Sequence, residues 1–406
     1  MALDYKNFAI VYEDGINDMV SKLDASGIFD NAKLRLQADC HVGKGCAVGT
    51  CLTYIDKIVP SLVGCDIACR VSAFDLGYDG MDEDILKAID KAIYERVPSG
   101  FNVRAVESEE SRDFDYEDLR CWDAIKAKED RFRKSMGTLG GGNHFIAVER
   151  GEKTGKYYLM VHCGTRNLGK AVFDYYQAEA IAIRDGRAAE IRERYRDVLN
   201  VAKAEGRYDE LEDILVRRDE VISALPENDL CYLEGDRMED YLHDMDVLRN
   251  WSRLNHEVIA GEIMDALGLA DTRDWYISSI HNYVDVECGI IRKGAISARL
   301  GEYGIIPMNM RDGSLLVIGK GNEDYLWSAP HGAGRIMSRA RARAELDMAE
   351  FRASMDGIYT TSVDELTIDE APDAYKTMKD ILPAIEPTVE VIERTIPVYN
   401  YKAHIL

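Results

Sequence analysis

The stretch "LQADCHVGKGCAVGTCLTYIDKIVPSLVGCDIACRVSAFD" (residues 36–75) indicates what kind of fold the chain adopts. It is rich in glycine, cysteine and β-branched residues, and it therefore predicts short strands joined by tight turns. Residues 156–162 and 314–318 are short apolar runs, which predict two further buried strands. The chain is expected to contain β-sheets on both sides of its middle third.

Helices are predicted where apolar residues recur at helical spacing. Residues 81–97 show this spacing and carry acidic residues in the first turn, which favours a helix N-terminus. The region of about 170–268 contains amphipathic segments and reads as a helical insertion between two strand-and-loop regions. Residues 377–395 predict a last helical region, interrupted at Pro383 and Pro387.

Composition limits the classes of protein to which this chain can belong. It has 406 residues, of which 46% are apolar, so it can form a large core. The formal net charge of −23 argues against broad, nonspecific nucleic-acid binding but allows a local basic groove. No apolar run of about 18 residues occurs, so no membrane span is expected. Nine cysteines without a secretory signal are expected to be reduced thiols in a cytoplasmic protein.

Several histidines lie where small neighbours would let a ligand approach. Five of the eight have glycine or asparagine nearby in loop-like segments: His41, His144, His162, His281 and His331. Imidazole is a common metal ligand, and "GCDIAC" (64–69) adds a carboxylate and a thiol. A deprotonated thiolate is able to bridge two cations. A metal site and a set of structural histidines both remain open from spacing alone.

Seven motifs, in order along the chain, resemble those of the RtcB family of RNA ligases, with divergence in the intervening loops. They are "DCHVGKG" (39–45), "GCDIAC" (64–69), "GTLGGGNHF" (137–145), "HCGTR" (162–166), "HNYV" (281–284), "RKGAISA" (292–298) and "HGAGRIMSR" (331–339). The resemblance implies an α+β fold: one domain over residues 1–406, with layered β-sheets, surrounding helices and the helical insertion.

The resemblance also implies a metal centre that holds two Mn²⁺ ions. Carried over residue by residue, Cys69 would bridge both ions. Asp66 and His144 would complete one site, and His162 and His281 would complete the other.

His331 would be the nucleophile that the resemblance implies. It would attack the α-phosphorus of GTP and carry the guanylyl group to an RNA 3′-phosphate, which a 5′-hydroxyl then attacks. A 2′,3′-cyclic phosphate would first be opened to a 3′-phosphate. Asp39 matches the family aspartate that orients or deprotonates this histidine, although a turn-capping role is the alternative. Gly332, Ala333 and Gly334 leave room for a nucleotide beside an unhindered nitrogen.

Further contacts are implied by the same resemblance. Asn143 matches a nucleotide contact, with a simple turn residue as the alternative. Ser314 lies in the loop that cradles the nucleotide, and Lys402 is the nearest candidate for a lysine that touches the base.

A set of basic side chains is expected to bind RNA or phosphate, since arginine binds phosphate through several N–H donors in a fork. It consists of Arg335 and Arg339, joined by Arg166 and Lys293 if the motifs converge. A helix face paired with nearby acids is the alternative. The partner is expected to be RNA with a 3′-phosphate or 2′,3′-cyclic phosphate end and a 5′-hydroxyl end, and an activating protein is allowed for.

The sequence departs from the family pattern at three places. Ala147 replaces a glutamate that contacts the sugar of the nucleotide. Arg70 replaces a glycine, and it either enters the site or redirects the loop. "PMNMRDGS" (307–314) replaces a Pro-Gly-Ser-Met-Gly stretch.

Two other functions compete with ligation. A metal-dependent phosphodiesterase would open cyclic phosphates without sealing, and a noncatalytic protein would only bind RNA. The glycines that surround His331 favour a ligase, and none of the implied metal ligands is missing.

Overall fold

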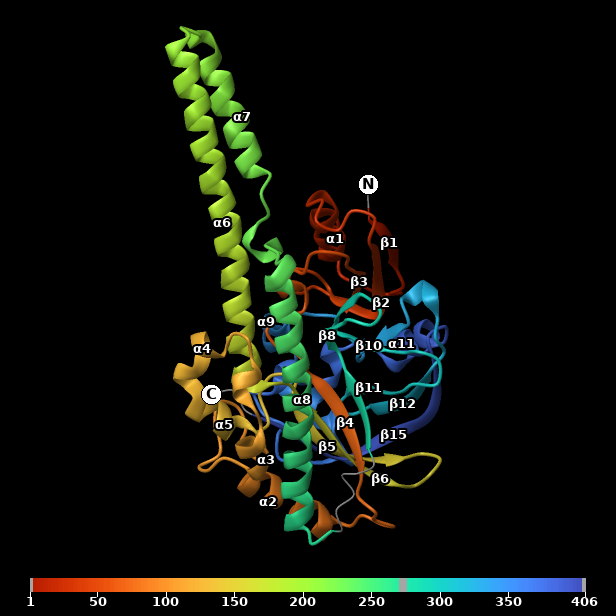
Figure 1. Cartoon of the computed structure of the whole chain (residues 1–406). Helices are drawn as coiled ribbons and strands as arrows, with labels where there is room; N and C mark the ends of the chain where they lie inside the picture. Colours follow the sequence, from red (N-terminus) through yellow and green to blue (C-terminus); the bar gives the residue numbers. More distant parts are fainter. Residues whose placement is uncertain (1–2, 270–275, 404–406) are drawn as a thin grey trace.

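Two β-sheets and a short ribbon form the centre of the protein, and helices cover their outer faces (Figure 1). The structure is a computed structural model that describes residues 3–269 and 276–403. Its mixture of antiparallel sheets and separate helices confirms the predicted α+β class.

The larger sheet contains eight strands in the order β11-β12-β15-β5-β6-β4-β7, with β14 beside β15. The main-chain N–H of Ile305 on one end strand donates to Ser279 Oγ on the other at 2.8 Å, so the sheet curls until its ends meet. The strands are β4 (Arg70–Asp75), β5 (Phe145–Gly151), β6 (Tyr157–Cys163), β7 (Tyr276–Ile280), β11 (Tyr303–Asn309), β12 (Gly313–Gly319), β14 (Tyr359–Thr360) and β15 (Val389–Lys402).

The smaller sheet has the order β1-β2-β3-β9-β8, and a two-stranded ribbon lies next to it. The sheet strands are β1 (Asp4–Asn7), β2 (Lys33–His41), β3 (Val48–Thr53), β8 (Asn282–Asp285) and β9 (Ile290–Lys293), and the ribbon strands are β10 (Ala295–Ser297) and β13 (Ser328–Pro330). The strands predicted within 36–75, 156–162 and 314–318 are therefore confirmed.

Strand β6 shows why the apolar run "YYLMVHC" does not alternate in polarity. All seven residues are buried, because both faces of the strand are covered. Leu159 and Val161 pack in a cluster with the helices that cover the outer face. Tyr158 and Met160 pack in a second cluster inside the curled sheet. His162 follows Met160 by two positions and therefore also faces inward.

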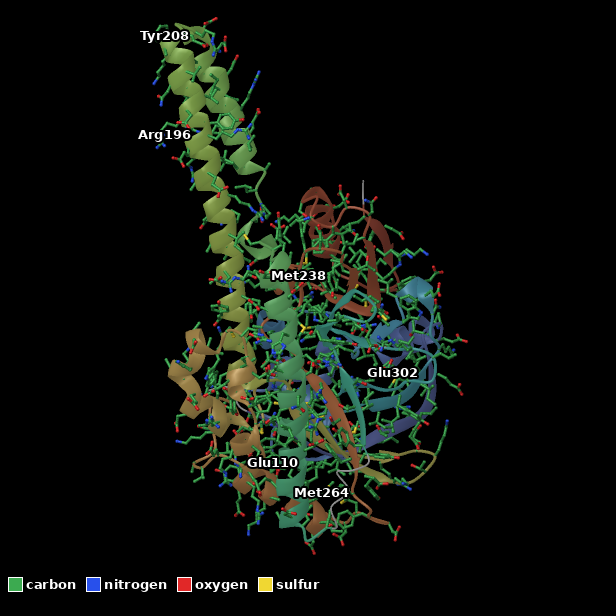
Figure 2. The ribbon with its side chains drawn as sticks, viewed as in Figure 1. Glu110, Arg196, Tyr208, Met238, Met264 and Glu302 are labelled. Atoms are coloured by element: carbon green, nitrogen blue, oxygen red, sulfur yellow. The ribbon has the colours of Figure 1, made fainter. Side chains whose placement is uncertain are left out.

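Helices α6 and α7 form a long hairpin that extends away from the body (Figure 1), with Arg196 and Tyr208 towards its free end (Figure 2). No helix within 3–269 or 276–403 is long and apolar enough to cross a membrane. The helices are α1 (Gly15–Ala25), α2 (Glu83–Arg96), α3 (Glu109–Asp113), α4 (Trp122–Ile125), α5 (Glu129–Ser135), α6 (Arg166–Ala204), α7 (Leu211–Ser223), α8 (Gly235–Ala266), α9 (Arg339–Glu345), α10 (Met348–Ser354) and α11 (Met378–Ile385). The helix predicted over 81–97 is confirmed as α2.

The predicted helical region at 377–395 is wrong in its second half. Helix α11 contains Pro383 and ends at Ile385, and the chain then enters β15. The segment after Pro387 contains several β-branched residues, which favour strands. Strand β15 pairs with β12 on one side and β5 on the other, and these partners supply the backbone hydrogen bonds that a helix would have made internally.

Candidate functional site

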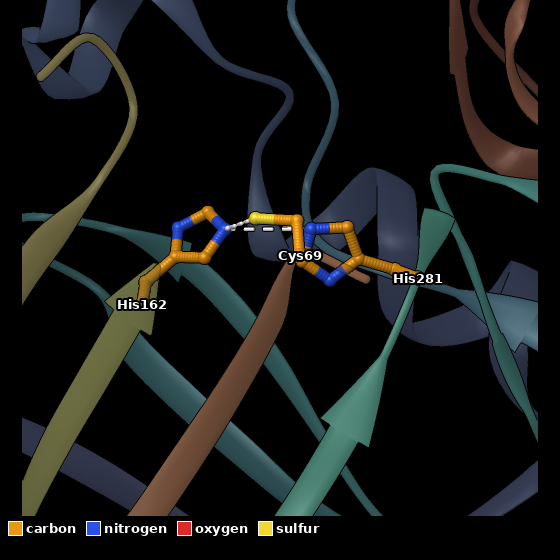
Figure 3. Close-up of side chains that lie close together, drawn as sticks. All are labelled: Cys69, His162 and His281. Atoms are coloured by element: carbon orange, nitrogen blue, oxygen red, sulfur yellow. Dashed lines mark hydrogen bonds between the residues drawn. The ribbon is translucent and has the colours of Figure 1, made fainter. Parts of the chain in front are cut away.

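Cys69, His162 and His281 meet where strands of the larger sheet end (Figure 3). Nε2 of His162 lies 3.3 Å from Cys69 Sγ and 3.4 Å from Nε2 of His281. Cys69 comes directly before β4, and its carbonyl accepts the main-chain N–H of His281 at 3.0 Å. Ala68 has a φ of 56°, a left-handed conformation that turns the chain into β4. The sheet therefore positions these side chains by its own backbone hydrogen bonds.

Asp66 and His144 lie on the other side of the same sulfur. Nε2 of His144 is 3.5 Å from Cys69 Sγ and 3.0 Å from Asp66 Oδ2. Two motif glycines make room for this arrangement. A Cβ at Gly140 would lie 2.2 Å from His144 Nδ1, and one at Gly164 would lie 2.0 Å from Asp66 Oδ1. Alanine at either position would displace one of these two side chains.

The two groups share one thiol and suit a pair of cations. Cys69 with His162 and His281 forms one group of potential ligand atoms, and Cys69 with Asp66 and His144 forms the other; within each group the atoms lie within 4.8 Å of one another. Lone pairs that converge at such short distances must be satisfied by protons or by cations between them. Sulfur, imidazole nitrogen and carboxylate oxygen together fit divalent first-row transition metals.

Burial determines the charge state of the histidines. It lowers the pKa of His162 and His281 well below the usual value, and repulsion from neighbouring histidines adds to the effect. Burial also opposes charging of His144, but the neighbouring Cys163 and Asp66 raise its pKa to about 9. Burial would raise the pKa of Asp66, yet His144 holds it at about 2. Neutral His162 and His281 have lone pairs free to bind a metal.

His331 is held by Asp39, which reaches it from β2. Asp39 Oδ2 lies 2.6 Å from His331 Nδ1 and also accepts the main-chain N–H groups of His331 at 3.0 Å and Gly332 at 3.3 Å. Asp39 is fully buried, and its contacts to the ring and to two main-chain N–H groups fit both roles considered for it. The carboxylate favours a proton on Nδ1, which leaves the Nε2 lone pair free. The ring centroids of His331 and His281 are 4.9 Å apart.

His331 opens into a cavity of about 480 Å³. Its lining includes the predicted nucleotide contacts Asn143, Gly332, Ala333, Gly334 and Lys402. A Cβ on Gly334, whose φ is +74°, would lie 2.1 Å from the Asp39 carbonyl oxygen, so only glycine fits there.

The sequence predicts a nucleotide contact at Ser314, but this residue does not line the cavity. The hydroxyl of Ser314 is buried and donates to Glu149 Oε1 at 3.1 Å, while its neighbour Gly313 borders the cavity instead. Ser314 shares the inner face of β12 with Leu316, but its hydroxyl is taken up by Glu149 and does not border the cavity.

Arg335 and Arg339 border the cavity but already have acidic partners. Arg339 contacts both Asp369 and Glu370, and Arg335 lies 3.4 Å from Glu370. Lys402 Nζ is 2.6 Å from the same Glu370. Burial would raise the pKa of Glu370, but Lys402 and Arg339 lower it to about 2. The acid-paired alternative therefore describes these arginines in the free protein.

Arg166 and Lys293 lie outside the cavity, so the four basic residues do not form one patch. Arg166 donates to the carbonyl of Gly100 and to Thr138 Oγ1. Lys293 is buried, and its ammonium donates to the carbonyls of Lys44 and Ser61. Both side chains support nearby loops.

The structure shows where the three departures from the family pattern lie relative to the site. Arg70 does not enter the site, because it points outward and donates to the Arg249 carbonyl in α8 at 3.0 Å. Ala147 lies on the inner face of β5 and is buried. The divergent loop still borders the cavity through Pro307 and the residues after it.

Several residues that line the cavity were not predicted from the sequence. Glu149 and Asn400 line the cavity from β5 and β15, and Glu370 and Tyr375 line it from the segment before α11. Strand alternation from Phe145 would have placed Glu149 on the same face, but no motif marks Asn400, Glu370 or Tyr375.

Comparison with known proteins agrees with this architecture. A family model described as tRNA-splicing ligase RtcB matches residues 25–403. The RNA-splicing ligase RtcB of Escherichia coli K12 is 29% identical over 391 residues, which covers 88% of this chain and 87% of that protein. RtcB1 of another E. coli strain gives the same values. The tRNA-splicing ligase RtcB of Archaeoglobus fulgidus is 25% identical over 432 residues, covering 86% and 82%.

Proposed function

The chain belongs to the RtcB family, and from this premise we propose that it is a GTP- and manganese-dependent ligase. It joins RNA ends that carry a 3′-phosphate or 2′,3′-cyclic phosphate to ends that carry a 5′-hydroxyl. The observation that carries the proposal is His331: its Nδ1 is bound to buried Asp39, and it lies beside the ligand cluster at a cavity of nucleotide size.

Cys69 would be shared by two manganese ions, with Asp66 and His144 on one side and His162 and His281 on the other. When bound, the ions neutralise phosphate oxygens during phosphoryl transfer. The chain's own contribution is to hold these ligands at close spacing, with Cys69 and the three histidines buried and Asp66 partly exposed.

In the first step, His331 Nε2 attacks the α-phosphorus of GTP, the bond to the bridging oxygen breaks, and pyrophosphate leaves. Asp39 keeps the proton on Nδ1 of His331 and stabilises the positive charge that develops on the ring. Gly332 and Gly334 allow the nucleotide to approach the main chain. Alignment of attacking and leaving atoms supplies much of the rate enhancement.

In the following steps, an RNA 3′-phosphate oxygen attacks the phosphorus held by His331, and the histidine leaves with its lone pair restored. The RNA 5′-hydroxyl then attacks the activated 3′-phosphorus, GMP leaves, and a phosphodiester forms. A 2′,3′-cyclic phosphate is hydrolysed to a 3′-phosphate before these steps.

We place the protein in the cytoplasm. All nine cysteines are free thiols, which supports a reducing compartment.

The test is incubation with Mn²⁺ and α-labelled GTP, followed by measurement of acid-labile label on the protein. Label is expected on the wild-type chain and none on His331→Ala. Opening of cyclic phosphates without label or sealing would instead support a phosphodiesterase, and RNA binding with neither activity would support a noncatalytic protein.

A further inference from the structure

One polar atom in the cavity wall has no partner. Asn400 is only 3% exposed, and its Oδ1 is buried without a hydrogen bond. Asn400 lies on β15 opposite Ala147 and lines the cavity together with Phe145 and Lys402. An unpartnered buried amide oxygen is costly, so its position in a cavity wall indicates that a ligand supplies the missing donor.

Glu149 provides a second acceptor on the same wall. It follows Phe145 and Ala147 on the inner face of β5 and is 3% exposed. Its oxygens accept the hydroxyls of Ser314 at 3.1 Å and Thr395 at 2.5 Å. An ionised carboxylate has about four acceptor positions, and two hydroxyls use only part of them, so Glu149 in its ionised form retains capacity for a ligand donor. Ala147, between the two, carries only a methyl group and leaves space.

Glu370, the other buried glutamate of the cavity, has no such capacity. Its Oε1 contacts Arg335 and Arg339, and its Oε2 contacts Lys402 and Tyr375. Four donors occupy its acceptor positions. Among the buried side chains of the cavity wall, Glu149 and Asn400 therefore keep acceptor positions for N–H groups of a ligand.

We propose that Glu149 and Asn400 select guanine by accepting the N–H groups on its Watson–Crick edge. Guanine is the one common base with two adjacent donors on this edge, N1–H and the 2-amino group. Adenine and cytosine present a ring nitrogen acceptor there, which would face acceptor atoms and be rejected. Phe145, Met308 and Met310 supply apolar surface for the plane of the base. The inference rests on the proposed function, because it requires a purine nucleotide in this cavity.

The wall keeps a carboxylate although position 147 is an alanine. Residues two apart on a strand face the same way, so Glu149 offers a carboxylate on the same wall, further along β5, and Asn400 supplies the second acceptor.

The test measures nucleotide binding in a His331→Ala background with Mn²⁺, using GTP, ITP and ATP. GTP is expected to bind more tightly than ATP. ITP lacks the 2-amino group and is expected to bind roughly 10-fold more weakly than GTP, the usual effect of one hydrogen bond. Glu149→Gln and Asn400→Ala are each expected to reduce the GTP-to-ATP preference roughly 10-fold or more. In the variant that loses the acceptor for the 2-amino group, GTP and ITP become equal.

Glu390→Gln is the matched control, because Glu390 is exposed on the same strand as Asn400. It should preserve the wild-type preference. Asn400→Leu, which is close in size, replaces Asn400→Ala if that variant fails to fold. Unchanged preferences in the Glu149 and Asn400 variants, or equal binding of GTP and ATP by the parent, overturn the inference. Absence of any nucleotide binding and of guanylylation in the wild-type chain overturns the proposed function instead.

Discussion

Replacing Glu149 with glutamine removes a carboxyl group that burial makes difficult to ionise. Burial raises the pKa of Glu149 from 4.5 to about 7, although hydrogen bonds from Thr395 and Ser314 partly offset the effect. Glutamine has nearly the same shape, and its amide oxygen still accepts a hydroxyl hydrogen bond. The substitution therefore tests the carboxyl group with little change in packing.

The expected magnitude follows from the two pKa values. Below pH 4.5 both the folded and the unfolded chain hold the proton, and the group does not disturb folding. As the pH rises towards 7, the unfolded chain releases the proton while the folded chain retains it, so stability falls. At about 1.4 kcal/mol per pH unit, the full difference corresponds to roughly 3 kcal/mol, of which about 2.5 kcal/mol is lost between pH 5 and pH 8.

The assay is urea unfolding of metal-free wild-type and Glu149→Gln chains at pH 5 and pH 8. The free energy of unfolding should shift in favour of the variant by about 2.5 kcal/mol on going to pH 8. Glu390→Gln, at an exposed position on β15, should follow the wild type. Parallel pH dependence of the wild type and Glu149→Gln would show that the buried carboxyl ionises as it does in water, and the reasoning would be refuted.

Three other predictions follow from the site. Asp39→Asn should slow guanylylation of His331 by roughly 10²–10⁴-fold while circular dichroism stays unchanged, because the ring loses its carboxylate partner; guanylylation at the wild-type rate would contradict this role. Cys69→Ser should reduce the binding of both Mn²⁺ ions, measured by elemental analysis after dialysis, since both ligand groups share the sulfur; two retained ions would exclude the shared thiolate. Gly334→Ala should lower stability by about 1–3 kcal/mol in thermal unfolding, from backbone strain and the clash with Asp39, whereas Gly357→Ala, in open space at a similar φ, should show only the strain.

The resemblance of the motifs to those of the RtcB family allowed the metal ligands and His331 to be proposed from sequence, whereas spacing alone left a metal site and structural histidines open. The structure shows why small residues surround these groups. Gly140 and Gly164 illustrate this, since each makes room for a specific ligand side chain. The strand at 156–162 was also predictable, because a continuous apolar run requires burial on both faces.

The rest of the cavity depends on which strands become neighbours. Asn400 faces Ala147 only because β15 pairs with β5 across about 250 residues of sequence, a long-range register that no local pattern encodes. Asp369 and Glu370 lie in a single turn of 3-10 helix that no motif marks, so their pairing with the arginines could not be foreseen. The same pairing of β15 on both sides turned a segment predicted as helix into a strand.

The acids beside the arginines affect how binding responds to ionic strength. Each arginine or lysine that neutralises an RNA phosphate normally displaces a condensed counterion, so affinity falls steeply as salt is added. Arg335, Arg339 and Lys402 already pair with Asp369 and Glu370, whose carboxylates a phosphate must displace or share. A plot of the logarithm of RNA affinity against the logarithm of salt concentration should therefore be shallower than a count of cationic side chains around the cavity suggests.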